Sequence, residues 1–238
     1  LGAEIKIDHG YIIATAANGL RGAEINFDKV SVGATENAIA AAVLAKGTTI
    51  IRNPALEPEV IDLAHMLQKM GAKIEGLGTK EITIEGVDRL NPVEYRPIPD
   101  RIEAGTYMVA AAITGGKLRI SNIVPNHLSM LIDKLRLAGV NIETGNDFAI
   151  VSADKNNILP VNVETREHPG FHTDLQAQFM ALMLVANGES SVTENIFENR
   201  FMHVAELKRF GADITIDGRT AHIKGGRKLY GAKVMATD

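Results

Sequence analysis

Hydrophobic positions along the chain follow two alternating periods, one typical of helices and one typical of strands. Residues 34–46 are apolar and rich in alanine and end before a glycine, which predicts a buried helix. Residues 47–53 predict a short strand. Apolar positions from Val60 to Met70 recur at helical spacing, and Pro58 marks the expected start of that helix. Residues 73–85 then predict a hairpin with alternating faces. The mixture indicates an α/β fold.

The same order of elements recurs twice more along the chain. The second copy is predicted as helix 103–114, strand 117–121, helix 126–138 and strands near 140–143 and 148–152. The third copy is predicted as helix 175–186, strand 190–193, helix 199–210 and strands 213–216 and 220–224. The repeating unit is therefore expected to be β-α-β-α-β-β, with a length of about 70 residues.

Three sequence marks keep the register of this repeat. Glycines at the end of each second helix are 69, 68 and 72 residues apart: Gly2, Gly71, Gly139 and Gly211. A glycine, a short strand and an asparagine recur at 47–53, 116–122 and 188–195. An acid stands near the start of each first helix, at Asp28, Asp100, Asp174 and Asp238. Because both chain ends fall inside units of this repeat, we expect the chain to be a piece of a longer protein.

Composition excludes several classes of protein. The 238 residues are 45% hydrophobic and 23% charged, with a net charge of -4, so the chain is not of the disordered class. The weak charge favours no nucleic acid partner, and no apolar run is long enough to span a membrane, so no membrane partner is expected. The chain has no cysteine, and its seven histidines lack metal-ligand spacing, so no metal site is expected.

Candidate chemistry begins at residues 28–35, DKVSVGAT. This segment combines a cation, a hydroxyl, a glycine and a helix start, which together suit a bound phosphate. An ordinary Ser or Thr helix cap beside a solvated lysine gives the same pattern.

Two further segments are open to two interpretations each. Asp174 follows a loop that contains Pro169 and Gly170, so its carboxylate is either a rigidly held general base or a helix cap. Residues 196–203 are rich in large apolar side chains, and either wall a binding cleft or fasten the following helix to the core.

Four segments carry a resemblance to a known family: DKVSVGAT, EHPGFHTD with QAQF, ENRFMHV and GAKVMATD. In this order they resemble the enolpyruvyl transferases that act on UDP-N-acetylglucosamine. The resemblance implies inside-out α/β barrel domains built from three such units each, with the substrates between two domains. Residues 1–98 would end the first domain, and residues 99–238 would form most of the second.

The resemblance also implies a reaction. The enolpyruvyl group of phosphoenolpyruvate would move to the 3-hydroxyl of UDP-N-acetylglucosamine, with release of phosphate and without a metal or organic cofactor. This step begins the synthesis of peptidoglycan precursors, which implies a cytoplasmic protein.

Site residues follow from the resemblance position by position. Asp174 matches the carboxylate that touches the attacking hydroxyl, and His172 stands where the family usually has proline. The other matched positions are substrate-binding: Lys29, Val30, Ser31, Val32 and Gly33 for the UDP group, Ile196 and Phe197 beside the sugar nucleotide, the cations Arg101 and Arg200, and Asp238 of the last motif. The family's reactive cysteine and most of its phosphoenolpyruvate-binding arginines have no counterpart in this chain, so we expect the chain alone to be inactive.

Two alternatives remain open from the sequence. One is an enolpyruvyl transferase of the shikimate pathway, which shares the repeat. The other is a non-catalytic repeat protein that binds a nucleotide or a partner.

Overall fold

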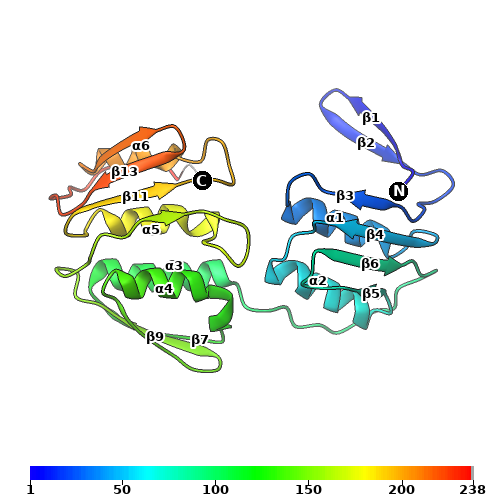
Figure 1. The fold of residues 1–238 in the computed structure, drawn as a ribbon, viewed down its shortest axis with the longest axis horizontal. Helices are drawn as coiled ribbons and strands as arrows, with labels where there is room; N and C mark the ends of the chain where they lie inside the picture. The colour runs from blue at the N-terminus through cyan, green and yellow to red at the C-terminus, as the bar shows by residue number, and fades with distance from the viewer. Residues whose placement is uncertain (237–238) are drawn as a thin grey trace. The chain divides into compact units, whose positions relative to one another are not determined.

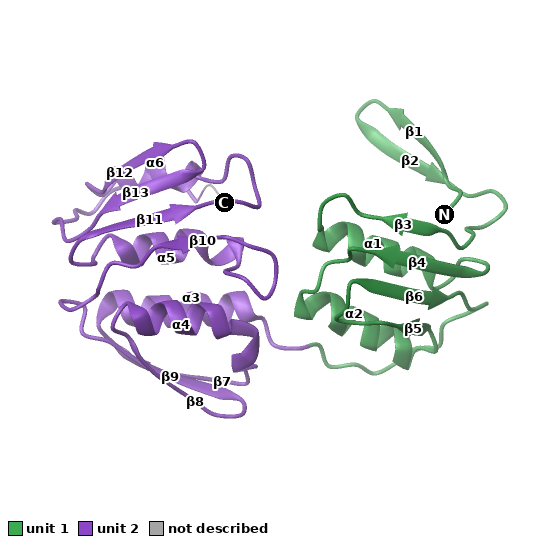
Figure 2. Cartoon of the chain, viewed as in Figure 1, with its two compact units in different colours: residues 1–97 green, residues 98–238 purple. Residues whose placement is uncertain are grey.

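The computed structural model describes residues 1–236, and its chain divides into two compact units after Pro97 (Figures 1 and 2). The sequence placed a boundary between residues 98 and 99. Whether the two units correspond to the two domains implied by the resemblance stays a prediction. No helix in the described part of the chain has both the length and the apolar character needed to cross a membrane.

The first unit contains one complete copy of the predicted repeat (Figure 1). Its elements are β3 (Glu24–Asn26), α1 (Val32–Ala42), β4 (Thr48–Arg52), α2 (Pro58–Lys69), β5 (Lys73–Glu75) and β6 (Glu81–Glu85). The sheet order is β3-β4-β6-β5, with β3 parallel to β4 and the other pairs antiparallel. A separate antiparallel hairpin, β1 (Glu4–Asp8) and β2 (Tyr11–Thr15), precedes this copy.

The second unit contains the two remaining copies (Figure 2). The first of them has α3 (Arg101–Thr114), β7 (Lys117–Ser121), the 3₁₀ turn η1 (Pro125–Leu128), α4 (Ser129–Leu137), β8 (Asn141–Thr144) and β9 (Phe148–Ser152). The other has β10 (Val163–Glu164), the 3₁₀ turn η2 (Thr173–Leu175), α5 (Gln176–Met183), β11 (Glu189–Thr193), α6 (Met202–Arg209), β12 (Asp213–Asp217) and β13 (Thr220–Lys224). Helices α3 and α5 pack together, with a sheet on either side.

The sheets confirm the predicted repeat in the first and third copies, but the middle copy has one strand fewer than predicted. The order β10-β11-β13-β12 reproduces the order β3-β4-β6-β5, including the parallel first pair. The middle sheet, β7-β9-β8, lacks the expected first strand, and residues 86–100 contain no strand. This segment carries Pro92, Pro97 and Pro99, which supply no backbone N–H to a ladder, so it does not pair as the first strand does in the other copies.

Helix ends follow the sequence marks with small shifts. Gly71, Gly139 and Gly211 adopt φ of 105°, 86° and 91°, a left-handed conformation that glycine reaches at little cost. The third helix of the second unit was expected over 175–186 and the last over 199–210, but α5 ends at Met183 and α6 begins at Met202. The residues just before α6 form a loop whose side chains bind one another and η2 instead.

Each unit has its own hydrophobic core. Twelve buried residues form the core of the first unit, between Ile39 and Ile84. Thirty-one buried residues form the core of the second unit, between Ala104 and Ile223. In the second core the rings of Phe171 and Phe179 meet edge to face, with centroids 5.3 Å apart. Phe171 therefore anchors the chain just before the turn that carries Asp174.

Candidate active site

Asp174 lies in the turn η2 between β10 and α5, where its carboxylate binds a cation rather than the helix. Its Oδ1 accepts a hydrogen bond from Arg200 Nη1 at 2.7 Å, and the side chain is 43% exposed. The cap of the turn is His172, whose Nδ1 accepts the Asp174 N–H at 3.1 Å. The interpretation of Asp174 as a helix cap is therefore wrong, and its carboxylate is held at the protein surface by charge.

His172 caps the turn and lies close to the carboxylate of Asp174. Its Nδ1 accepts the Asp174 N–H and lies 3.4 Å from Asp174 Oδ2. Gln178 Nε2 donates to the Asp174 carbonyl at 2.9 Å and to Thr106 Oγ1 at 3.0 Å, which ties the turn to α3. The turn is thus held by hydrogen bonds from His172 and from Gln178, although His172 stands where the family usually has proline.

Arg200 connects Asp174 to the loop that precedes α6. Its Nη1 also donates to Thr173 Oγ1 at 3.1 Å, and its guanidinium carbon lies 5.1 Å from the ring centre of Phe197. Phe197 is 51% exposed, whereas Phe201 at the other end of the loop is buried in the core. The loop thus fastens α6 through Phe201 and presents Phe197 to solvent. The structure brings Asp174, Arg200 and Phe197, with its neighbour Ile196, into one cluster.

The first helix of the first unit begins as its sequence pattern suggested. Ser31 is the cap of α1, and its Oγ accepts the Ala34 N–H at 3.3 Å. The cap interpretation is therefore confirmed for Ser31. Lys29 is exposed, the first turn contains no acid, and a Cβ built on Gly33 has no other atom of the described chain within 4 Å. The surface at this helix start, with Val30 and Val32 partly buried beside it, is thus open.

The remaining predicted site residues are placed differently. Arg101 is the first residue of α3 and only 5% exposed, behind the cap Asp100, whose Oδ1 accepts the N–H groups of Ile102 and Glu103. Asp238 lies outside the described residues. The roles assigned to both residues stay predictions.

The comparisons with known proteins settle the family. A family model described as EPSP synthase (3-phosphoshikimate 1-carboxyvinyltransferase) matches residues 1–238. The chain belongs to the EPSP synthase family. A solved structure with this fold, the enolpyruvyl transferase NikO from Streptomyces tendae, has a TM-score of 0.85 and 26% identity over 94% of this chain and 56% of that one. The predicted enolpyruvyl transferase fold is confirmed.

Within this family, curated relatives share one description. UDP-N-acetylglucosamine 1-carboxyvinyltransferase of Trichlorobacter lovleyi is 57% identical over the whole of this chain and 57% of its own length. The protein of the same description from Myxococcus xanthus is 57% identical over the whole of this chain and 56% of its own length. The resemblance to enolpyruvyl transferases of this type is therefore confirmed. The chain spans little more than half the length of these EPSP synthase family members.

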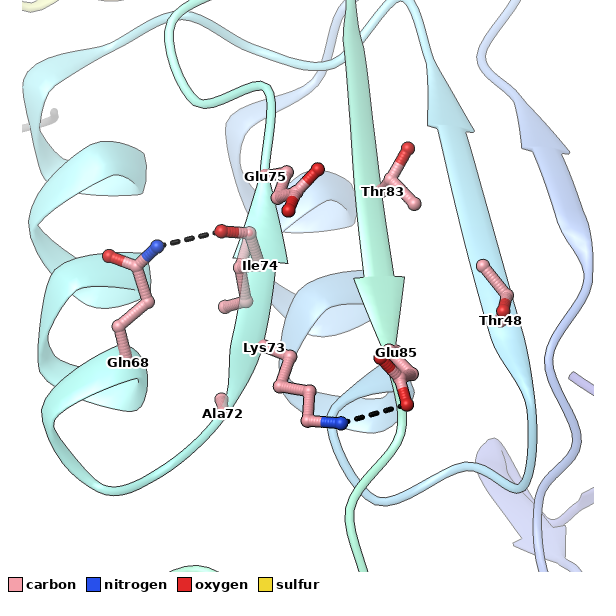
Figure 3. A pocket seen from close by; sticks show the side chains of 8 residues that line it. All are labelled: Thr48, Gln68, Ala72, Lys73, Ile74, Glu75, Thr83 and Glu85. Atoms are coloured by element: carbon pink, nitrogen blue, oxygen red, sulfur yellow. Dashed lines mark hydrogen bonds and ion pairs between the residues drawn. The ribbon is translucent and has the colours of Figure 1, made fainter.

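None of these residues lines the surface hollow of the first unit. Figure 3 shows its lining by residues of α2, of the turn before β5 and of the strands β4, β5 and β6: Thr48, Gln68, Ala72, Lys73, Ile74, Glu75, Thr83 and Glu85. Lys73 Nζ binds Glu85 Oε1 at 2.8 Å, and Gln68 Nε2 donates to the Ile74 carbonyl at 2.7 Å. Three of its polar side chains, Lys73, Glu85 and Gln68, are thus engaged within the unit, and we do not assign the family's chemistry to it.

Among the described residues, no group of three or more His, Cys, Asp or Glu is arranged to hold a metal.

The cluster around Asp174 includes one residue that the sequence did not bring forward. Glu194, directly after β11, is 1% exposed and accepts hydrogen bonds from the loop and from η2. The repeat contained a signal, since Glu194 occupies the place that Asn53 has in the first unit. Asn53 and Glu194 both donate their N–H across the sheet, to Lys80 and Arg219 respectively. Aligning Asn53 with Asn195 instead, as the sequence mark suggested, is wrong by one residue.

Proposed function

We propose that the full-length protein transfers the enolpyruvyl group of phosphoenolpyruvate to the 3-hydroxyl of UDP-N-acetylglucosamine. The observation that carries the proposal for this chain is the Asp174–Arg200 pair, a surface carboxylate held in one orientation at 2.7 Å. The description shared by relatives at 57% identity supports the choice of substrates.

Asp174 is the proposed general base. Arg200 engages Oδ1, which leaves Oδ2 to accept the proton of the sugar hydroxyl. As that O–H bond breaks, the sugar oxygen bonds to the second carbon of phosphoenolpyruvate, whose carbon–carbon double bond opens as its third carbon takes a proton from solvent. The third carbon then returns a proton to solvent, which restores the double bond as the bond between the second carbon and the phosphate oxygen breaks. Phosphate leaves with the proton that Asp174 received. Cationic side chains stabilise the charge that develops on the departing group.

The sugar nucleotide would be bound by two groups of residues. In the first, Lys29 supplies charge and the start of α1, from Val30 to Gly33, supplies an uncrowded helix N-terminus for the diphosphate. In the second, Ile196 and Phe197 lie against the sugar nucleotide near Arg200. Arg101 and Asp238 are further proposed binding residues.

Replacement of Asp174 tests this proposal most directly. In the full-length protein, Asp174→Asn keeps the shape of the side chain but removes its ability to take a proton, so turnover should fall by about 10²- to 10⁴-fold. Binding of UDP-N-acetylglucosamine, measured by calorimetry, should persist. The matched control is Asp133→Asn, an acid of α4 with a 67% exposed side chain. Turnover of Asp174→Asn at the level of the control would remove Asp174 from the role of base.

The shikimate enzyme is the second candidate, because the matching family model carries that description. Turnover with UDP-N-acetylglucosamine but not with shikimate 3-phosphate is expected, and the reverse result would favour the second candidate. Calorimetric titration with the sugar nucleotide, with and without phosphoenolpyruvate, separates both from a non-catalytic binding protein. We also propose a cytoplasmic location, which fractionation of the source cells tests.

A further inference from the structure

Glu194 is a buried carboxylate that is surrounded by hydrogen-bond donors. Its side chain is 1% exposed, a position that costs free energy unless each oxygen is well bound. Five groups donate to it: on Oε1, Thr165 Oγ1 at 2.8 Å, Ile196 N at 2.9 Å and Phe197 N at 3.0 Å; on Oε2, Thr173 Oγ1 at 2.8 Å and Gln176 Nε2 at 3.3 Å. A group that only accepts hydrogen bonds is required at this position.

One oxygen of Glu194 leads to the proposed base through a single hydroxyl. The Thr173 hydroxyl donates its one hydrogen to Glu194 Oε2, and its oxygen accepts from Arg200 Nη1 at 3.1 Å. The same Nη1 binds Asp174 Oδ1 at 2.7 Å. Gln176 Nε2 adds a second connection, because it also donates to the Arg200 carbonyl at 3.2 Å. The orientation of Asp174 therefore depends on where Glu194 holds Thr173 and Arg200.

The other oxygen holds the backbone of the loop. Glu194 Oε1 binds the N–H groups of Ile196 and Phe197, the two residues proposed to contact the sugar nucleotide. Thr165 secures the same oxygen and accepts the N–H of Asn195 at 2.8 Å. One carboxylate thus orders two segments that are far apart in the chain, η2 and the loop before α6.

The repeat shows that the fold does not require an acid here. In the first unit, Asn53 holds the equivalent place after β4, and its Nδ2 donates to the Phe27 carbonyl at 2.9 Å. A neutral amide therefore suffices to join the second strand of the repeat to the segment after the first. Only the copy that carries Asp174 and Arg200 replaces the amide by a carboxylate.

We propose that Glu194 is a positioning residue of the active site, which aligns Asp174 through Thr173 and Arg200 and shapes the sugar-nucleotide loop through Ile196 and Phe197. The inference rests on the proposed function for its kinetic consequences. Its structural part, the ordering of the two segments, can be measured without turnover.

The test uses Glu194→Gln in the full-length protein, with Glu189→Gln as the matched control. Glutamine keeps the size of the side chain but turns an NH₂ group toward donors, so η2 and the loop must shift. We expect kcat to fall by about 100-fold and the KM for UDP-N-acetylglucosamine to rise, since small misplacements of this kind are costly. Glu189 lies on the same strand, is exposed and loses the same charge, so its variant should match the wild type. Glu194→Asp, which retains two accepting oxygens, should recover part of both losses.

Hydrogen exchange on the same samples separates this inference from the proposed function. Amides of residues 195–198 should exchange faster in Glu194→Gln than in Glu189→Gln, while those of β11 stay protected. If Glu194→Gln does not fold, Glu194→Asp takes its place in both measurements. An inactive wild type would overturn the proposed function. The hydrogen-exchange comparison would still test whether Glu194 orders η2 and the loop before α6. Unchanged kcat, KM and protection in the Glu194 variant would overturn the inference.

Discussion

At the scale of single residues, the contacts of Arg200 favour a planar guanidinium over another cationic side chain at this position. One nitrogen, Nη1, binds both the Thr173 hydroxyl and the Asp174 carboxylate, while the planar group lies over the Phe197 ring. A guanidinium can make these contacts together because its donors are fixed in one plane. A lysine has the same charge but no such plane.

Arg200→Lys should therefore lower turnover while preserving the charge. We expect kcat of the full-length protein to fall by between about 10- and 100-fold, because the carboxylate of Asp174 is no longer held in one orientation. Steady-state kinetics provide the measurement. Arg209→Lys, which alters an exposed arginine paired with Glu206 on α6, is the control and should leave kcat unchanged. Equal kcat values for the two variants would contradict the proposed role of Arg200.

A second residue-scale effect concerns Glu36 of α1. Desolvation by burial, followed by the charges of Glu59 and Glu57, raises the pKa of its carboxyl above the ordinary value of glutamate. The folded state therefore holds this proton more tightly than the unfolded state. The stability of the fold consequently decreases as pH rises from the ordinary pKa through the raised one.

Glu36→Gln removes this pH-dependent penalty. The variant should be more stable than the wild type at neutral pH, and the difference should shrink in acid below the ordinary glutamate pKa. Urea unfolding at a series of pH values provides the free energies. Glu75→Gln, at an exposed position of β5, serves as the control. A stability difference for Glu36→Gln that does not change with pH would contradict the assignment.

At the scale of elements, the first helices of the three copies begin with three different caps. Ser31 caps α1, Asp100 caps α3 and His172 caps η2. The recurring acid is thus a cap only in the middle copy. Where a serine or a histidine caps the helix or turn, the carboxylate of the repeat does not bind the helix N–H groups and can bind another side chain. Asp174 does so by accepting a hydrogen bond from Arg200.

Gly33→Ala separates helix stability from ligand binding in α1. Alanine is the better helix former, and its Cβ meets no atom of the described chain, so unfolding should cost up to about 1 kcal/mol more. The added methyl group would crowd the helix start, so calorimetry on the full-length protein should give weaker binding of UDP-N-acetylglucosamine. Ala40→Gly, at an exposed position of the same helix, should lose stability without changing affinity. Tighter or unchanged binding by Gly33→Ala would contradict the proposed nucleotide site.

Helix and strand periodicity predicted most elements of the fold, because each copy buries one helix face and alternate strand positions. The boundaries that failed lie where long-range contacts replace local ones. Helix α6 begins late since the residues before it bind Glu194 and Thr173, and the middle sheet lacks its first strand where three prolines occur. The family motifs pointed to Asp174 and Arg200 as site residues but did not predict the hydrogen bond between them. Glu194 was missed because its importance arises from donors up to 29 residues away in sequence, which periodicity does not reveal.

At the scale of the whole molecule, the two hydrophobic cores share no residue. The core of the first unit comes from residues 39–84, and that of the second unit from residues 104–223. Most of the free energy that orders a unit comes from apolar area buried within its own core. Damage to one core is therefore expected to loosen that unit first.

Ile51→Ala and Leu135→Ala test this local dependence. Both side chains are fully buried, Ile51 in the first core and Leu135 in the second, and each truncation should cost about 2–5 kcal/mol. Hydrogen exchange with peptide resolution should show lost protection only within residues 1–97 for Ile51→Ala, and only from residue 98 onward for Leu135→Ala. Leu44→Ala, which removes a 51% exposed side chain from the first unit, should change little. Loss of protection in both units from either core variant would show that the two cores depend on each other.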